Sequence, residues 1–393
     1  MTTATLAPRA RIRQTARPSL ITRSLLLRFV SIIGASVSFY LPLSVMPMYA
    51  KSSGASTGAG LVTGALLLTT VAVELMTPRL LARVGYRLSL TVGLLLLGAP
   101  ALALLASSDP AVIIGVSILR GAGFAVATVA GGALTASLIP PERRGEGLGL
   151  VGIVGGVPAL VALPAGVWVA AHWGFGPVFA ATAAAALLAL VVMPGMPGDR
   201  GADVHAHEVL PRLRDRALRR PAAVFSASAM AAGVLVTFVP LAIAGRSAAV
   251  ATIALFAQPA ASTLARWAAG KTGDRRGHAR LLCPGVVLSA VGMAALAATS
   301  SPALVIGGAA AFGVGFGLLQ NATLTLMYAR VPASGQTAVS AIWNAAYDAG
   351  MGAGAIGMGL LAGHIGYSGV FLLTAALVMT ALLGARRESA AGR

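Results

Sequence analysis

Apolar runs long enough to cross a lipid bilayer recur along the whole of this chain. A bilayer core of about 30 Å requires about 20 apolar residues of helix, and short breaks rich in Gly, Pro and charge divide the sequence into such runs. The 393 residues are 57% hydrophobic and only 10% charged, which no water-soluble domain matches. We predict twelve membrane spans, at residues 25–49, 59–78, 88–106, 111–138, 148–170, 176–194, 221–244, 248–269, 281–299, 303–329, 337–361 and 367–385.

The placement of the basic residues predicts the orientation of these spans. A net charge of +18 would suggest nucleic acid as the partner of a soluble protein. Here, however, 26 of the 29 Lys and Arg fall on segments that share one side of the membrane. Lys51 and Arg246 fall on the other side, and Arg120 lies within the membrane. This bias places both termini in the cytoplasm and excludes nucleic acid as a partner. The excess of Arg over Lys is typical of a GC-rich bacterium, so we expect a multi-pass protein of the bacterial plasma membrane.

A shift of 192 residues superimposes the two halves of the sequence. It brings Gly115, Gly121, Gly123 and Phe124 onto Gly307, Gly313, Gly315 and Phe316. Each half then holds six spans, and an even number returns the chain to the same side, so the halves have parallel orientation. The predicted fold is an all-α membrane protein of two six-helix repeats. Its parts are a tail (1–24), a bundle (25–194), a cytoplasmic linker (195–220), a second bundle (221–385) and a tail (386–393).

Two loops at corresponding places in the halves carry related motifs. The second copy, GKTGDRRGHAR, supplies Gly270, Asp274, Arg275 and Gly277. The first copy, PRLLARVGYR, supplies Arg83, Gly85 and Arg87, with Pro78 for the opening Gly and Ala82 for the acid. Both resemble the loop signature of the major facilitator superfamily, Gly-x-x-x-Asp-Arg/Lys-x-Gly-Arg/Lys. The resemblance implies that these charges tie helix ends together in one conformation and release them in another.

Three further motifs resemble those of drug-proton antiporters of the same superfamily. Arg120 in LRGAGFAV stands near the middle of its span, where an unpaired cation is costly, so it is a candidate for proton coupling; the alternative is a structural pair with an acid. IPPERRGEGLGL, from Ile139, looks like the loop after the fourth span in bacterial exporters. The fifth span resembles a degenerate antiporter motif or, alternatively, packs closely through its small residues; it contains Gly152, Gly156, Pro158 and Pro164.

Two acids within the predicted spans are the other candidates for proton coupling, Glu74 and Asp348. A carboxyl group in a low-dielectric site can hold a proton at physiological pH and cross between states in neutral form. Asn344 shares the helix face of Asp348, with Trp343 and Tyr347 beside it. The alternatives are that Glu74 pairs with a basic residue at the membrane surface and that Asp348 makes a structural polar contact.

Other polar residues of the spans complete the candidate substrate cavity, which we expect to contain Asn344, Trp343, Tyr347, Gln320, Asn321 and Tyr40. For each of them, hydrogen bonding between helices is the alternative. The sequence shows no nucleotide-binding loop, catalytic carboxylate pair, nucleophile elbow or His/Cys metal cluster. We therefore expect no enzyme activity, no cofactor and no metal.

The resemblance covers nearly the whole chain and implies a secondary transporter whose two bundles alternate around a central site. We expect a monomer that exports small amphipathic drugs or metabolites in exchange for protons. One alternative is a sugar or organic-acid uptake carrier of the same fold, although an anion carrier should line its cavity with more cations than Arg120 alone. Another is a membrane sensor or scaffold without transport activity.

Overall fold

Helices account for nearly the whole of the described chain. The computed structural model describes residue 19 and residues 21–54, 58–140, 144–198, 215–243, 247–331 and 336–391, and no strand occurs among them. Lipid offers backbone groups no hydrogen-bond partners, so a chain this apolar satisfies them within helices. The predicted all-α membrane fold is confirmed.

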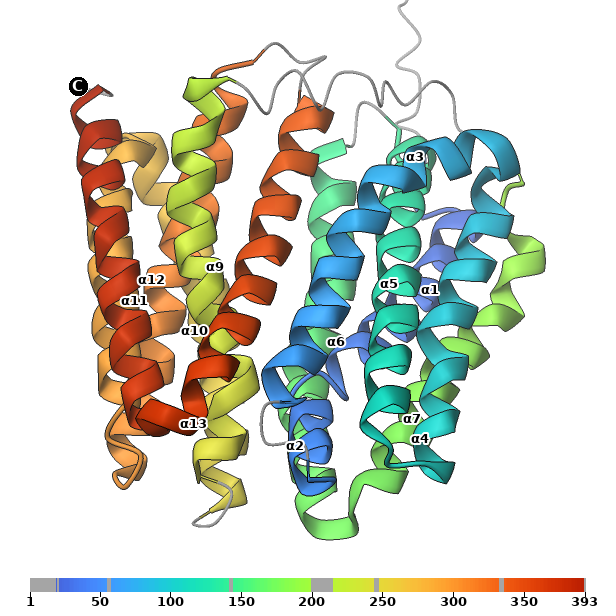
Figure 1. The fold of residues 1–393 in the computed structure, drawn as a ribbon. Helices are drawn as coiled ribbons and strands as arrows, with labels where there is room; N and C mark the ends of the chain where they lie inside the picture. Colours follow the sequence, from blue (N-terminus) through green and yellow to red (C-terminus); the bar gives the residue numbers. More distant parts are fainter. Residues whose placement is uncertain are drawn as a thin grey trace, which may run out of the picture.

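The helices form two bundles that stand side by side (Figure 1). The first contains α1 (Arg23–Tyr40), α2 (Val45–Ser52), α3 (Gly58–Gly98), η1 (Ala99–Leu102), α4 (Ala103–Ala106), α5 (Pro110–Leu138), α6 (Arg144–Trp173), α7 (Phe175–Leu188) and η3 (Ala189–Gly195). The second contains α9 (Arg216–Ile243), α10 (Ala248–Arg276), η5 (His278–Leu281), α11 (Leu282–Leu296), α12 (Pro302–Tyr328) and α13 (Gln336–Ala391). We call the face where α9 begins, uppermost in Figure 1, the linker face, and the opposite face, where α2 ends, the far face.

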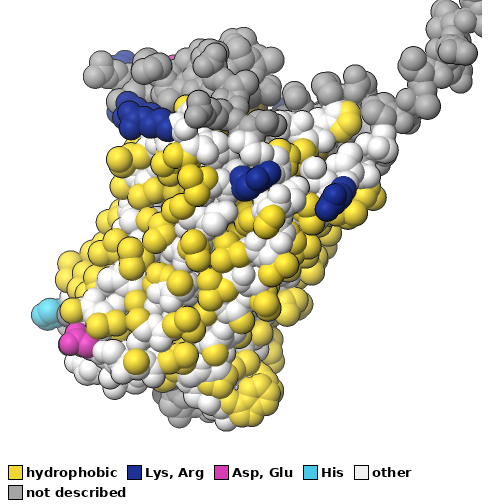
Figure 2. Space-filling view, turned by 90° about the vertical axis from the view of Figure 1, so that its right-hand side faces the viewer, with side chains coloured by type: hydrophobic (Ala, Val, Ile, Leu, Met, Phe, Trp, Pro, Cys, Tyr) yellow, Lys and Arg dark blue, Asp and Glu magenta, His cyan; other side chains and the backbone are white. Residues whose placement is uncertain are grey.

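Eleven helical segments of the described chain are long and apolar enough to cross a membrane. The last of them, Val339–Ala390, has 52 residues and is broken at Gly366, where φ is 65°. It therefore supplies two spans, and the twelve spans predicted from sequence are present. On the side shown in Figure 2, an apolar band separates Lys and Arg side chains at the upper end from an acidic side chain and a His at the lower end.

The first span differs from the prediction because it is not one helix. The predicted span 25–49 is divided into α1 and α2 by a turn at residues 41–44. Pro42 lies in this turn and has no N–H to donate, so it leaves the carbonyl of Ser38, four residues earlier, without its helical partner. The break sets Tyr40 at the end of α1, beside the interface between the bundles.

The repeat is visible in the backbone as well as in the sequence. Gly85 (φ 78°) turns the chain between two spans of α3, and its counterpart Gly277 (φ 88°) follows α10. Gly174 (φ 81°) and Gly366 (φ 65°) turn the chain at the far face in the same way. Both pairs are 192 residues apart, and only glycine adopts such angles without strain. This explains Gly85 and Gly277 of the loop motif and confirms two like-oriented repeats.

Paired glycines also bring equivalent helices into contact. A Cβ atom on Gly121 of α5 would meet the carbonyl oxygen of Leu66 in α3, and one on Gly313 of α12 would meet the carbonyl oxygen of Gln258 in α10. Leu66 and Gln258 are themselves 192 residues apart. The same helix crossing is therefore built twice, through backbone contact that a side chain would prevent.

The two bundles are tied together near the far face. The hydrogen bonds that join them run from Ser44 Oγ to the Val236 carbonyl (2.8 Å), from Thr237 Oγ1 to the Thr63 hydroxyl (3.1 Å) and from Lys51 Nζ to the Tyr367 hydroxyl (2.7 Å). Gly60 of α3 also packs against the backbone of α13 at Ala355. Nearer the linker face, the interface residues Asn344 and Arg266 are exposed. The interface therefore opens toward the linker face.

Gly121→Ala tests the helix crossing. The added methyl group would displace α3 from α5, so we expect it to destabilise the protein by about 1–3 kcal/mol, as overpacking does elsewhere. Gly115→Ala on the same helix is the matched control, because its Cβ would meet no atom within 4 Å. Thermal unfolding of the detergent-purified variants measures both; equal melting temperatures for the two would contradict the described packing.

Candidate functional site

A cavity of about 160 Å³ lies where the two bundles meet. It is lined by Phe39, Tyr40, Leu43, Leu67, Glu74, Phe124, Thr128, Asn344, Tyr347, Asp348 and Met351. The first seven come from α1, the turn that follows it, α3 and α5, and the last four from α13. The cavity therefore belongs to neither bundle alone, which is the position expected of a site that two moving halves share.

Five of the polar and aromatic residues singled out from the sequence face this cavity together. They are Tyr40, Glu74, Asn344, Tyr347 and Asp348. Asp348 is buried and Glu74 half-buried, and both line this one cavity. No described basic residue forms an ion pair with either acid. The structure thus places Glu74 at the cavity rather than in a pair with a surface arginine.

An aromatic cluster behind the cavity holds the α13 side chains in place. Phe225 of α9 stacks on Trp343, with ring centroids 4.2 Å apart, and on Tyr347, at 5.9 Å. The indole N–H of Trp343 donates to Thr323 Oγ1 of α12 (3.0 Å). Trp343 therefore lies in the wall behind Tyr347 and is not among the residues that line the cavity.

Phe39 and Phe124 form the opposite, aromatic wall of the cavity, and sequence reasoning missed both. Their rings stack with centroids 3.6 Å apart, which joins α1 to α5. Phe124 has a counterpart in the repeat, Phe316, which packs in the aromatic cluster of the other bundle. That equivalence was the one signal in the sequence that could have drawn attention to it.

Arg266 of α10 is a second residue that the sequence did not identify. It was assigned to the cytoplasmic end of its span, but α10 continues to Arg276, and Arg266 is exposed within the interface. There its guanidinium lies within electrostatic range of Tyr40 and Tyr347. The expectation that Arg120 is the only cation at depth is therefore wrong.

Arg120 lies inside the first bundle and does not line the cavity. It is fully buried, and its guanidinium donates to the carbonyl oxygens of Ser38 and Leu97, both at 2.6 Å. Both carbonyls stand before prolines that cannot donate to them: Pro42 follows Ser38 by four residues, and Pro100 follows Leu97 by three in the tighter η1 segment. Arg120 thus replaces missing backbone donors at two helix breaks, and no described acid pairs with it.

Arg28 of α1 is a further buried arginine that the sequence analysis had counted with the cytoplasmic residues. Its Nε donates to the Gly131 carbonyl and to Thr135 Oγ1, both at 3.2 Å, and its Nη1 donates to Ser31 Oγ (2.9 Å). Like Arg120, it joins α1 to α5 through neutral acceptors. Buried arginines therefore act mainly as links between helices in this bundle.

The remaining predicted cavity residues lie in the second bundle. Gln320 Oε1 accepts a hydrogen bond from Ser262 Oγ (3.3 Å), which joins α12 to α10. Asn321 lies beside Gly270, and its Oδ1 is buried without a hydrogen-bond partner among the described residues. Neither lines the 160 Å³ cavity in this arrangement of the bundles.

The loop-motif residues occupy the linker face. Arg87 donates twice to the carbonyl of Met196, from Nε (2.9 Å) and Nη2 (2.6 Å), and so ties α3 to the end of the first bundle. Arg83 and Arg275 are exposed, while the side chain of Asp274 lies outside the described part of the chain, as does Arg246. The latch that the motif implies therefore stays a prediction.

The close packing expected in the fifth span is found at a different glycine. Side chains on Gly152 and Gly156 would meet no atom within 4 Å, because this part of α6 faces outward, so the expectation of close approach there is wrong. A Cβ on Gly166 would instead meet the carbonyl oxygen of Leu41, in the break after α1.

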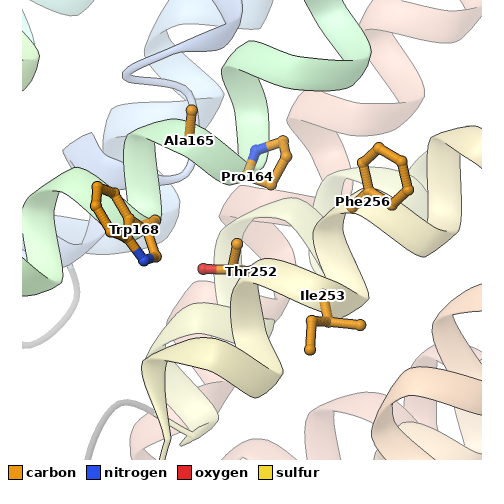
Figure 3. A pocket seen from close by; sticks show the side chains of 6 residues that line it. All are labelled: Pro164, Ala165, Trp168, Thr252, Ile253 and Phe256. Atoms are coloured by element: carbon orange, nitrogen blue, oxygen red, sulfur yellow. The ribbon is translucent and has the colours of Figure 1, made fainter.

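Pro164 of the fifth span borders a second cavity, between α6 and α10. Figure 3 shows its lining residues, Pro164, Ala165, Trp168, Thr252, Ile253 and Phe256, converging from the two helices. It has a volume of about 350 Å³ and is almost wholly apolar. Within the described residues, no group of three or more His, Cys, Asp or Glu could hold a metal ion.

Comparison with known protein families gives one match that spans nearly the whole chain. The model described as "Major Facilitator Superfamily" matches residues 28–246 and again residues 222–391. Among curated proteins, the "Tetracenomycin C resistance and export protein" of Streptomyces glaucescens is 32% identical over 115 residues. That alignment covers 29% of this chain and 21% of the relative, so the chain matches about a fifth of the relative's length.

Solved transporter structures share the fold over almost their full length. The nucleoside transporter NupG aligns with a TM-score of 0.72 and 14% identity, covering 93% of this chain and 99% of that chain. A bacterial homologue of the human lysosomal transporter Spinster aligns with a TM-score of 0.73 and 13% identity, covering 94% of this chain and 96% of that chain. A POT family transporter aligns with a TM-score of 0.73 and 11% identity, covering 92% of this chain and 95% of that chain. At these identities the likeness concerns the fold alone.

Arg120→Gln tests the role of the buried guanidinium. Glutamine is too short to reach both carbonyls, and a buried unsatisfied acceptor costs about 1–3 kcal/mol, so we expect a large loss of thermal stability. Arg23→Gln, at an exposed arginine on the linker face, is the control. Adding Pro42→Ala should restore part of the loss, because the new N–H can serve the Ser38 carbonyl. If Arg120→Gln and Arg23→Gln unfold at the same temperature, Arg120 is not a structural link.

Proposed function

The chain is a membrane transporter that belongs to the Major Facilitator Superfamily, and we propose that it exports small amphipathic molecules in exchange for protons. One observation carries the proposal: Glu74 and Asp348, contributed by different bundles, face a single cavity at the interface. A carrier that alternates between two sides needs a charge whose neutralisation is coupled to movement of the halves. A carboxyl pair across the interface meets that need.

The chemistry of the pair supports exchange between a proton and a cation. Two carboxylates that face each other in a site of low dielectric repel, and a proton or a cationic substrate relieves the repulsion. Binding of one then disfavours binding of the other, because both neutralise the same charge. The result is antiport, in which substrate is released on the side where protons enter the site.

The walls of the cavity indicate the class of substrate. Tyr40, Tyr347, Phe39 and Phe124 offer aromatic faces, which bind planar apolar groups and cations. Asn344 and the two acids add polar partners on one side. We therefore expect an aromatic or amphipathic compound with a positive charge or several hydrogen-bond donors.

The direction of transport is inferred from the curated relative. The curated relative named above is a resistance and export protein, and it shares 32% identity over 115 residues. We propose that this chain likewise exports its substrate, as a monomer in a bacterial plasma membrane with both termini in the cytoplasm. In that orientation the interface opens toward the cytoplasm, where an exporter collects its substrate.

Arg266 favours a second candidate, uptake of an organic acid together with protons. Its guanidinium lies within electrostatic range of Tyr40 and Tyr347, and a guanidinium is a good partner for a carboxylate. In that case, protons and substrate would move in the same direction. The relative direction of the two flows separates the candidates.

Liposomes that contain the purified protein and an internal pH-sensitive dye test the proposal. With ethidium as a cationic aromatic probe, an imposed pH gradient should drive ethidium against the flow of protons. Asp348→Asn should abolish this coupling and weaken ethidium binding by about 2 kcal/mol, a factor of about 30, because a charge-assisted contact is lost. Glu74→Gln should act in the same direction.

Asp215→Asn is the matched control for these variants. It removes a carboxylate at the linker face, outside the cavity, where Asn can still cap the N-terminus of α9. This variant should transport like the unmodified protein. Coupled efflux that survives Asp348→Asn and Glu74→Gln together would refute the role of the acid pair, and proton and substrate flow in one direction would favour the uptake carrier.

A further inference from the structure

Three arginines at the start of α9 form a basic cavity on the linker face. Arg216, Arg219 and Arg220 line a space of about 360 Å³ together with Ala223. All three side chains are exposed, and no described acid pairs with them. Asp215 lies next to them, but its Oδ1 accepts the N–H of Ala217 and caps the helix (2.8 Å).

A further arginine beside α9 is engaged elsewhere. Arg330, just after α12, donates to the Ala217 carbonyl and forms an ion pair with Glu388 of α13. Glu388 is thereby neutralised by Arg330, and Asp215 forms no ion pair with the three arginines of α9. These three positive charges outnumber the one described carboxylate beside them.

An apolar groove adjoins the basic cavity and shares Arg219 and Ala223 with it. It has a volume of about 390 Å³ and runs between α3, α9 and α13. Its walls include Val71, Leu75, Ala222, Ser226, Ile342 and Ala349. The groove is open because α9 and α13 carry mainly alanines along it.

The groove is separate from the central cavity. On α13, Asn344, Tyr347 and Met351 line the central cavity, whereas Ile342, Ala345 and Ala349 line the groove. At 3.6 residues per turn these two sets occupy opposite faces of the helix. The groove side of α13 therefore points away from the central cavity.

The depth of the groove matches the upper part of a lipid chain. Arg216 is the first residue of α9, at the end of its span, and Ser226 follows ten residues later. At a rise of 1.5 Å per residue, the basic cavity and the groove together extend about 15 Å along α9. A ligand that fills both spaces needs a negative head at the arginines and an apolar tail of about this length.

We propose that an anionic phospholipid binds here, with its phosphate headgroup at Arg216, Arg219 and Arg220 and one acyl chain in the α3–α9–α13 groove. Basic clusters at the membrane surface attract anionic headgroups, and a groove between spans adds contacts that a free phosphate ion cannot make. A zwitterionic lipid would fill the groove but leave the positive charge of the cluster unbalanced.

Such a lipid also couples to the movement of the bundles. Val71 and Leu75 belong to the first bundle, and the rest of the groove belongs to the second. The groove therefore keeps its shape only while α3 and α13 hold this separation at the linker face. A bound lipid stabilises this arrangement against the one that closes the linker face.

Native mass spectrometry of the full-length protein, titrated with dioleoyl phosphatidylglycerol or dioleoyl phosphatidylethanolamine, tests the proposal. The unmodified protein should bind the anionic lipid at least about tenfold more tightly. Arg219→Gln combined with Arg220→Gln should remove most of this preference. Arg386→Gln combined with Arg387→Gln, which removes two exposed charges at the end of α13, should leave it intact.

A second variant tests the groove. Ala223→Leu fills it while keeping the arginines, so it should weaken binding of the dioleoyl lipid but not of dihexanoyl phosphatidylglycerol. Equal affinities of the unmodified protein for the two dioleoyl lipids would overturn the proposal, whatever the variants do. So would an equal loss in the Arg386/Arg387 control, which would indicate general surface charge, or full competition by inorganic phosphate, which would indicate a free-anion site.

Discussion

Lipid cannot hydrogen-bond to a peptide group, and this constraint shapes the fold down to the central cavity. Where prolines interrupt the spans, other donors must serve the freed carbonyls. Arg120 does so for Ser38 and Leu97, and it thereby fixes the end of α1, where Tyr40 enters the cavity. The break after α1 also allows Ser44 to reach across to Val236 in the other bundle. A buried cation that looks like transport machinery in the sequence is thus, in this arrangement, a substitute for two missing backbone donors.

The two bundles are joined near the far face by small polar contacts and glycine packing, and they enclose charged groups between them. This division of labour suits a transporter. Neutral hydroxyl contacts such as Thr237 to Thr63 are weak, whereas Glu74 and Asp348, one from each bundle, line the same cavity. In the proposed mechanism the two carboxylates repel each other unless a proton or a cation is bound. The energy of binding can therefore drive movement of the bundles, because the site is complete only when residues of both are in place.

The helix count and the repeat followed from the sequence because they depend on two features that can be read from it directly: span length and a constant offset. Cavity residues that are polar could also be predicted, because a polar side chain is rare in an apolar span. These are Glu74, Asp348, Tyr40, Asn344 and Tyr347. Phe39 and Phe124 could not, since an aromatic residue in an apolar span carries no such contrast. Arg266 was counted with the cytoplasmic residues because it lies three residues before the predicted end of its span, whereas α10 continues to Arg276. The spacing of Gly152 and Gly156 could not show which way that part of α6 faces.

The central claim is that the acid pair sets the balance between the two arrangements of the bundles. Electron spin resonance distances between labels at Arg83 and Arg275 on the linker face, and at His172 and His364 on the far face, test it most directly. Each pair is related by the repeat and exposed, and Cys283 would be replaced by Ala in the labelled protein. The account predicts that Glu74→Gln with Asp348→Asn, which mimics the protonated pair, shifts the two distances in opposite directions. Distances that stay unchanged, or that change together, would contradict it.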